Sequence, residues 1–174
     1  MIQLNIPREL KVKIWKYLQD NNIGQRGNAD GNQEEQYVGL LGEYTIKHYL
    51  GMKMDFAGGF DGGFDLTDAD EKKWDVKTMG RMVEPQPHYV NNLIASQLNY
   101  DCDYYLFCSL NKRTSVLTVC GYISTTTFKK IAYFTPEGKK ITRDDGTTFK
   151  MKTDNWTIAN EDLHQAFGLE QLFF

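Results

Sequence analysis

The sequence predicts a single domain that combines helices and strands, of the α/β or α+β class. Its 174 residues are enough for one domain with its own core and too few for two ordinary domains. Hydrophobic residues make up 41% and charged residues 25%, which is typical of a globular chain and not of a disordered or fibrous one. Segments with helical spacing and short segments of alternating polarity follow one another, without an internal repeat or a convincing linker.

Two helices are predicted in the first third of the chain. Pro7 can open the first, which ends at the Asn21-Asn22 pair. The apolar residues of this helix recur at helical spacing: Leu10, Ile14, Tyr17 and Leu18. The second helix runs from about Gln33 to Leu50 and is closed by Gly51. Its apolar residues lie on most sides, so we expect much of it to be buried.

Strands dominate the rest of the predicted domain. Residues 64–67 and 73–78 alternate in polarity around a polar stretch and predict a hairpin. Further strands are expected at 104–110 and 114–123, followed by a short helix capped by Ser124 or Thr125. The last part of the chain predicts an added β-hairpin over residues 133–158 and a terminal helix from about Glu161 to Phe167.

The charge is distributed unevenly along the chain, although the net charge is only −3. Residues 30–75 carry eleven acids and four bases, and residues 129–152 carry seven bases and three acids. Residues 1–29 add five bases and two acids. An acidic middle between basic segments suits a metal site beside a polyanion, but solvated surfaces explain the charges equally well.

The most informative residues lie in the predicted hairpin. In a strand over 73–78, Asp75 and Lys77 share one face, whereas Trp74 and Val76 share the other. We expect the apolar pair to be buried and the charged pair to be exposed. If the hairpin loop is centred on Asp70, the Asp65 carboxylate lies opposite Asp75. Like charges in that position destabilise a sheet by up to ~1 kcal/mol, and Lys77 and a divalent cation can compensate.

A third carboxylate for such a cation is best provided by Glu43. This residue lies in the second predicted helix, next to Gly42 and one turn after Gly39. Glycine inside a helix costs ~1 kcal/mol relative to alanine, so the two glycines suggest a close approach of the helix backbone to another group. The simpler alternative is that Glu43 pairs with Lys47 on its own helix and that Asp75 and Lys77 form a surface ion pair.

These residues resemble the PD-(D/E)XK nuclease superfamily. The elements are Gly-Leu-Leu-Gly-Glu43-Tyr, Gly-Gly-Phe-Asp65-Leu and Trp-Asp75-Val-Lys77-Thr, with Phe64 in place of the nominal proline. The similarity covers about residues 33–128, and within the superfamily the chain resembles small phage and prophage members. It implies a mixed central sheet flanked by helices. It also implies that Glu43, Asp65, Asp75 and Val76 hold Mg²⁺ (or Mn²⁺), and that Lys77 orients the attacking water or stabilises the transition-state charge.

The function that the resemblance implies is Mg²⁺-dependent hydrolysis of phosphodiester bonds in DNA, with RNA as an open alternative. Gln97 is a candidate contact to the scissile phosphate. The basic segment supplies three candidate contacts to the nucleic-acid backbone: Lys139, Lys140 and Arg143. Many members of the superfamily are dimers, so a homodimer is a further option. The rival hypothesis is a catalytically silent module of the same fold that binds nucleic acid or another protein.

The sequence also favours a cytoplasmic protein, in a bacterial host if the chain is encoded by a phage. No apolar run approaches the ~20 residues of a membrane helix, and the first residues lack the charged and apolar regions of a signal peptide. Three cysteines without a CxxC spacing predict neither a disulfide framework nor a zinc site.

Overall fold

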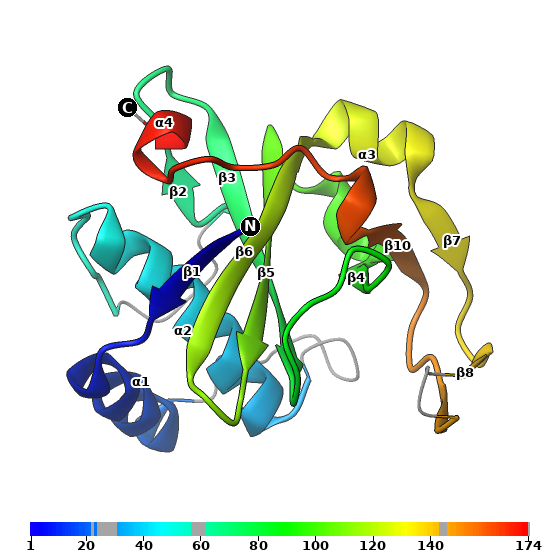
Figure 1. The fold of residues 1–174 in the computed structure, drawn as a ribbon, viewed down its shortest axis with the longest axis horizontal. Coiled ribbons are helices and arrows are strands. Elements are labelled where there is room, and N and C mark those ends of the chain that lie inside the picture. Colours follow the sequence, from blue (N-terminus) through cyan, green and yellow to red (C-terminus); the bar gives the residue numbers. More distant parts are fainter. Residues whose placement is uncertain (22, 24–30, 57–61, 143–145, 174) are drawn as a thin grey trace.

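A mixed five-stranded sheet forms the centre of the protein (Figure 1). The computed structural model describes residues 1–21, 23, 31–56, 62–142 and 146–173. The strand order is β1-β6-β5-β3-β2, and only the β3–β5 pair is parallel. The strands are β1 (Ile2–Asn5), β2 (Leu66–Thr67), β3 (Lys73–Arg81), β5 (Tyr104–Asn111) and β6 (Val116–Ser124). The predicted α+β class with a mixed central sheet is therefore confirmed.

The two long helices form where their sequence signals predict them. Helix α1 (Arg8–Asp20) begins directly after Pro7. Helix α2 (Gln33–Tyr49) begins with a capping box, in which the side chains of Asn32 and Glu35 each accept the other residue's backbone N–H. Gly51 follows the end of α2 with a φ of 64°, the left-handed conformation that glycine adopts readily.

Helices α1 and α2 cover one face of the central sheet. Their buried residues join those of the even-numbered positions of β3 and β5 in one apolar cluster, together with the short C-terminal helix α4 (Glu170–Phe173). The cluster includes Leu10, Ile14, Val38, Leu41, Val76, Leu106 and Phe173. Of the described helices, none is long and apolar enough to cross a membrane.

The other face of the sheet is covered by helix α3 (Thr125–Ile131) and by a second, three-stranded sheet. This sheet has the order β4-β10-β7, with β4 (Val90–Ile94), β10 (Asn155–Ala159) and β7 (Tyr133–Thr135). A second apolar cluster fills the space between the two sheets and α3. It includes Leu93, Tyr105, Phe107, Phe128 and Ile158.

Strands β7 and β10 continue outward as a projecting arm, which we define as residues 133–142 and 146–159. Beyond β7 and β10, the arm contains a small hairpin of β8 (Lys140–Thr142) and β9 (Thr148–Lys150). The predicted hairpin over 133–158 is therefore present, and β4 adds a third strand to it. Along the long axis of the molecule, β8 lies at the opposite end from β2 and α1 (Figure 1).

Sequence analysis missed strands β1 and β4, and its terminal helix is wrong. Residues 160–162 form one 3-10 turn, and the helical residues come later, in α4. Leu163, Ala166 and Leu169 recur at an apparently helical spacing, and all three are buried. They lie in an irregular segment and not in a helix, because the backbone of His164 exchanges two 2.9 Å hydrogen bonds with Tyr122 in β6. Contacts with a distant strand override the local periodicity here.

Candidate functional site

The hairpin of β2 and β3 has the register that its turn predicts. Leu66 pairs with Trp74 and Thr67 with Lys73, so the next position places Asp65 alongside Asp75. Asp65 donates its N–H to the Trp74 carbonyl at 2.8 Å, and its Oδ2 accepts the Val76 N–H at 2.7 Å. Because β2 has only two residues, the Asp65 carboxylate occupies the edge of β3 where a longer partner strand would continue.

Gly63 brings the chain to this edge. It is buried and has a φ of 89°, and a Cβ at this position would lie 2.7 Å from the Cβ of Tyr100. A side chain larger than hydrogen would therefore both strain the backbone and collide with Tyr100. The approach to Asp65 thus depends on contact with a segment more than thirty residues away.

Asp75 and Lys77 form an ion pair on one face of β3, with Lys77 Nζ 2.7 Å from Asp75 Oδ2. Their side chains are only 5% and 19% exposed, so the prediction that this pair is exposed is wrong. The physical reason is a tertiary contact: the parallel register places Asp75 beside Tyr105 and Lys77 beside Phe107, and both aromatic residues are fully buried in the second apolar cluster. Paired residues point to the same face of a sheet, so this face of β3 is the one that α3 and the second sheet cover.

Glu43 is held beside β3 by close packing of its helix. The Cβ of an alanine at Gly42 would lie 1.8 Å from Thr78 Oγ1, so only glycine lets α2 approach β3 as it does. The predicted close approach is confirmed at Gly42. It is not found at Gly39, where an added Cβ would meet no described atom within 4 Å beyond its own helix turn.

Lys47 also belongs to the site. Its Nζ lies 2.5 Å from Glu43 Oε1, and the two side chains are 16% and 15% exposed. Sequence analysis treated this pair as the alternative to a functional role for Glu43, and the signal for it was the spacing of four residues on a helix. The structure shows that the pair is largely shielded from solvent, which brings a second ammonium group next to the carboxylates.

Asp65 lies in the electrostatic field of both other carboxylates. Burial, with the negative charges of Glu43 and then Asp75, holds the pKa of the Asp65 carboxyl well above its usual range. Lys77 and the Val76 N–H oppose this rise in the pKa because they stabilise the charged form. Asp65 thus interacts electrostatically with each of the other three predicted residues, Glu43, Asp75 and Lys77.

The unfavourable environment of Asp65 predicts that Asp65→Asn stabilises the protein near pH 7 in the absence of divalent cations. A carboxyl whose pKa is raised by folding penalises the folded state once the pH exceeds its unfolded pKa of about 3.9. Asparagine removes this penalty and keeps an oxygen that can accept the Val76 N–H. We expect a melting temperature higher than wild type by a few degrees at pH 7.

The same comparison at low pH provides the control. Near pH 3 and below, the wild-type carboxyl is protonated in both states, so the advantage of Asp65→Asn should disappear. Thermal unfolding in EDTA at the two pH values measures both effects. A variant that is less stable than wild type at pH 7 would show that the Asp65 charge is compensated in the folded protein.

The donor set suits Mg²⁺ chemically, because all three acidic side chains offer the oxygen ligands that this ion prefers. Among the described residues, however, no group of three or more His, Cys, Asp or Glu side chains is placed so that it could hold a metal ion as it stands. Two carboxylates are instead directed toward ammonium groups, Glu43 toward Lys47 and Asp75 toward Lys77. Counted by themselves, these three acids and two bases carry a formal net charge of −1, which a cation would reduce.

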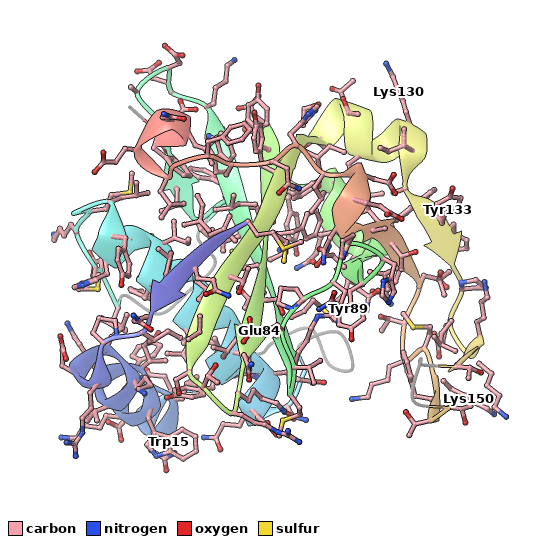
Figure 2. The ribbon with its side chains drawn as sticks, in the orientation of Figure 1. Trp15, Glu84, Tyr89, Lys130, Tyr133 and Lys150 are labelled. Atoms are coloured by element: carbon pink, nitrogen blue, oxygen red, sulfur yellow. The ribbon has the colours of Figure 1, made fainter. Side chains whose placement is uncertain are left out.

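The candidate substrate contacts on the arm lie apart from these carboxylates. Gln97 is half-buried in the 3-10 helix Ala95–Asn99, and its contact to the scissile phosphate stays a prediction. Lys139 and Lys140 are exposed on the arm, and Lys140 lies directly opposite Lys150. Arg143 lies outside the described residues. Figure 2 shows the distance of the arm from α1, with Lys150 and Tyr133 at one end of the molecule and Trp15 at the other.

Comparison with known proteins identifies no relative from which the roles of the site residues could be inferred. No family model matches the sequence, and no curated protein or solved structure matches the chain. The resemblance to PD-(D/E)XK nucleases therefore depends on the three motifs and on the contacts that their residues make.

Proposed function

We propose that this protein is a Mg²⁺-dependent deoxyribonuclease that hydrolyses phosphodiester bonds at the edge of β3. The observation that supports this most is the environment of Asp65, a desolvated carboxyl placed between two further acids and next to Lys77. Such an arrangement opposes folding, and residues that reduce stability in this way are concentrated at functional sites. The order of the motifs along the chain agrees with the nuclease superfamily that the sequence resembles.

In the proposed mechanism, Glu43, Asp65 and Asp75 would hold the cation, and the Val76 main chain keeps the Asp65 carboxylate in place through its N–H. When bound, Mg²⁺ would lower the pKa of a water molecule and polarise the phosphoryl oxygens. Lys77 provides a fixed positive charge at the same edge of the sheet. Its ammonium group orients the attacking water or stabilises the negative charge that accumulates on the phosphoryl group, an effect that typically contributes a few kcal/mol.

The second candidate function is a binding module that needs no metal. The observation that favours it is the pairing of Glu43 with Lys47 and of Asp75 with Lys77, which partly neutralises the acids without a cation. In that case the basic residues of the arm would contact nucleic acid, and the carboxylates would contribute only to the ion pairs of the folded protein. The two functions differ in one measurable property, the response of the folded protein to Mg²⁺.

We expect Mg²⁺ and Mn²⁺ to raise the melting temperature of the wild-type protein. A ligand present at ten times its dissociation constant stabilises the folded state by about 1.4 kcal/mol, which corresponds to roughly 3–6 °C for a chain of this length. Asp75→Asn should remove most of this shift because it deletes a charged ligand. Asp70→Asn, in the exposed turn of the same hairpin, is the matched control and should keep the full shift.

Differential scanning fluorimetry across a Mg²⁺ titration makes this measurement without any nucleic acid. A wild-type melting temperature that does not respond to either cation would contradict the nuclease and favour the binding module. Equal responses of Asp75→Asn and wild type would place the cation elsewhere on the protein.

A further inference from the structure

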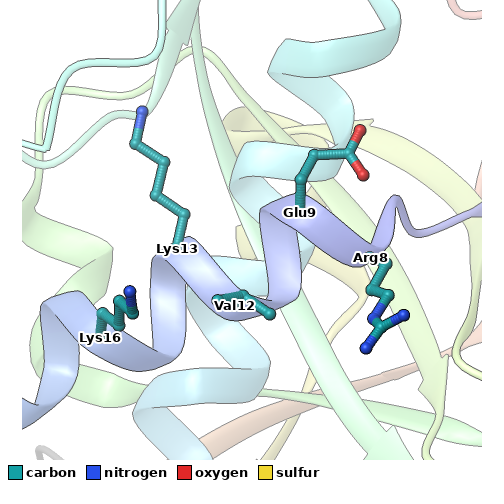
Figure 3. Close-up of a pocket in the computed structure, with 5 residues that line it drawn as sticks. All are labelled: Arg8, Glu9, Val12, Lys13 and Lys16. Carbon is teal, nitrogen blue, oxygen red and sulfur yellow. The ribbon is translucent and has the colours of Figure 1, made fainter.

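Helix α1 presents an exposed basic surface to solvent. Lys13 and Lys16 are both exposed, and within the described part of the chain neither forms an ion pair. Together with Arg8, Glu9 and Val12 they line an open hollow of about 480 Å³, and the Lys13 side chain extends away from the helix axis (Figure 3). Most lysines around the carboxylates are paired with an acid, so the two unpaired ammonium groups of α1 are available to an anion.

A continuous series of contacts joins this surface to the carboxylates. Lys13 Nζ lies 4.5 Å from the centre of the Phe56 ring, and Phe56 stacks on Tyr44 with the ring centres 4.3 Å apart. Lys47 Nζ lies 5.1 Å from the centre of the Tyr44 ring and 2.5 Å from Glu43 Oε1. We name this series the cation–aromatic ladder. It places the ammonium group of Lys13 two stacked rings away from the amino group that contacts Glu43.

We infer that the Lys13 and Lys16 side of α1 binds the phosphodiester backbone of a nucleic acid whose cleaved bond lies at the carboxylates. Tyr44 is only 5% exposed, so the cation–aromatic ladder fixes the position of α1 relative to Glu43 and is not itself the path of the strand. This inference rests on the proposed nuclease function, and it adds the surface that holds the substrate. The chemistry that fits is a row of phosphates. The two exposed ammonium groups are about one helical turn apart and lie on a helix that packs near the acidic site, so they match a polyanion that carries its charges at regular intervals.

The location distinguishes α1 from the other basic surface of the protein. The arm carries Lys139, Lys140 and Lys150, but it lies at the opposite end of the molecule from α1 and β2 (Figures 1 and 2). The arm touches α2 through the Lys152–Glu35 ion pair at 3.8 Å, two helical turns before Glu43. Helix α1 is tied by the ladder to the Lys47–Glu43 pair itself, so a strand held on α1 lies nearer to the carboxylates.

The test is a salt titration of DNA binding in EDTA, where no cleavage takes place. The probe is a fluorescein-labelled DNA duplex of about 20 base pairs, read by anisotropy, and each lysine that contacts a phosphate contributes about one unit to the slope of log Kd against log salt. The double variant Lys13→Gln/Lys16→Gln should lower this slope by about two. Lys11→Gln is the matched control on the same helix, because Lys11 is half-buried and does not line the hollow, and it should leave the slope unchanged.

The outcomes separate this inference from the proposed function. An unchanged slope in the double variant overturns the inference, as does a loss that appears only in Lys139→Gln/Lys140→Gln on the arm. If the α1 variant lowers the slope but the wild-type protein cleaves no DNA in Mg²⁺ or Mn²⁺, the basic surface is supported and the nuclease is not. If wild type cleaves DNA but binding does not depend on Lys13 and Lys16, the nuclease stands and the inference about α1 falls.

Discussion

Lys77→Ala is expected to reduce Mg²⁺-dependent cleavage of DNA by at least about 10²-fold to 10³-fold, the usual effect of removing one preorganised group that stabilises transition-state charge. The ammonium group of Lys77 lies at the same edge of the sheet as the acids, 2.7 Å from Asp75 Oδ2. Its removal takes away the only predicted catalytic cation supplied by the chain itself. Release of acid-soluble fragments from labelled linear and circular DNA measures the loss.

Stability must be controlled in this experiment, because Asp75 is buried and loses its partner in Lys77→Ala. Breaking a buried ion pair in this way costs about 3–5 kcal/mol. The double variant Asp75→Asn/Lys77→Met removes both charges of this pair, so neither is left unpaired, and the protein should fold and still be inactive. Lys77→Arg keeps the positive charge and should retain more activity than either variant.

Lys73→Ala is the matched control on the same strand. Lys73 also pairs with an acid, but its partner Asp101 is largely exposed, so its loss should change cleavage and stability little. Cleavage by folded Lys77→Ala at the wild-type rate would show that the catalytic centre lies elsewhere.

Gly42→Ala is expected to destabilise the protein and to weaken its response to Mg²⁺. The added methyl group would lie 1.8 Å from Thr78 Oγ1, so α2 or β3 must move. Overpacking of this kind costs about 1–3 kcal/mol, and the gain in helix propensity from alanine offsets only ~1 kcal/mol. Any shift of the helix also displaces Glu43, the next residue, so stability and cation binding should fall together.

Gly39→Ala supplies the control, because it makes the same substitution one turn earlier on the same helix. Nothing described lies within 4 Å of the added group beyond its own helix turn, so this variant should be more stable than wild type by up to ~1 kcal/mol. Adding Thr78→Ala to Gly42→Ala should restore part of the lost stability. Urea unfolding of the four proteins decides the matter, and equal stabilities of the two glycine variants would contradict the close packing of α2 on β3.

The sequence contained the local parts of this site. Caps and apolar spacing predict α1 and α2, because helix hydrogen bonds and side-chain contacts lie within four residues of each other. The alignment of Asp65 with Asp75 follows from the symmetry of one short turn. Gly42 was recognised because glycine is costly inside a helix and therefore indicates a close contact.

Only the tertiary structure decided how these parts are buried and joined. The face that carries Asp75 is buried by elements outside the hairpin, and β1, β4 and the segment around His164 are held by strands that are distant in the sequence. The link from Lys13 through Phe56 and Tyr44 to Lys47 joins two helices and a loop. Residue type and periodicity set the charge and the local conformation of each segment, whereas desolvation and Coulomb interactions depend on which distant segments pack against it, and that is determined only when the whole chain folds.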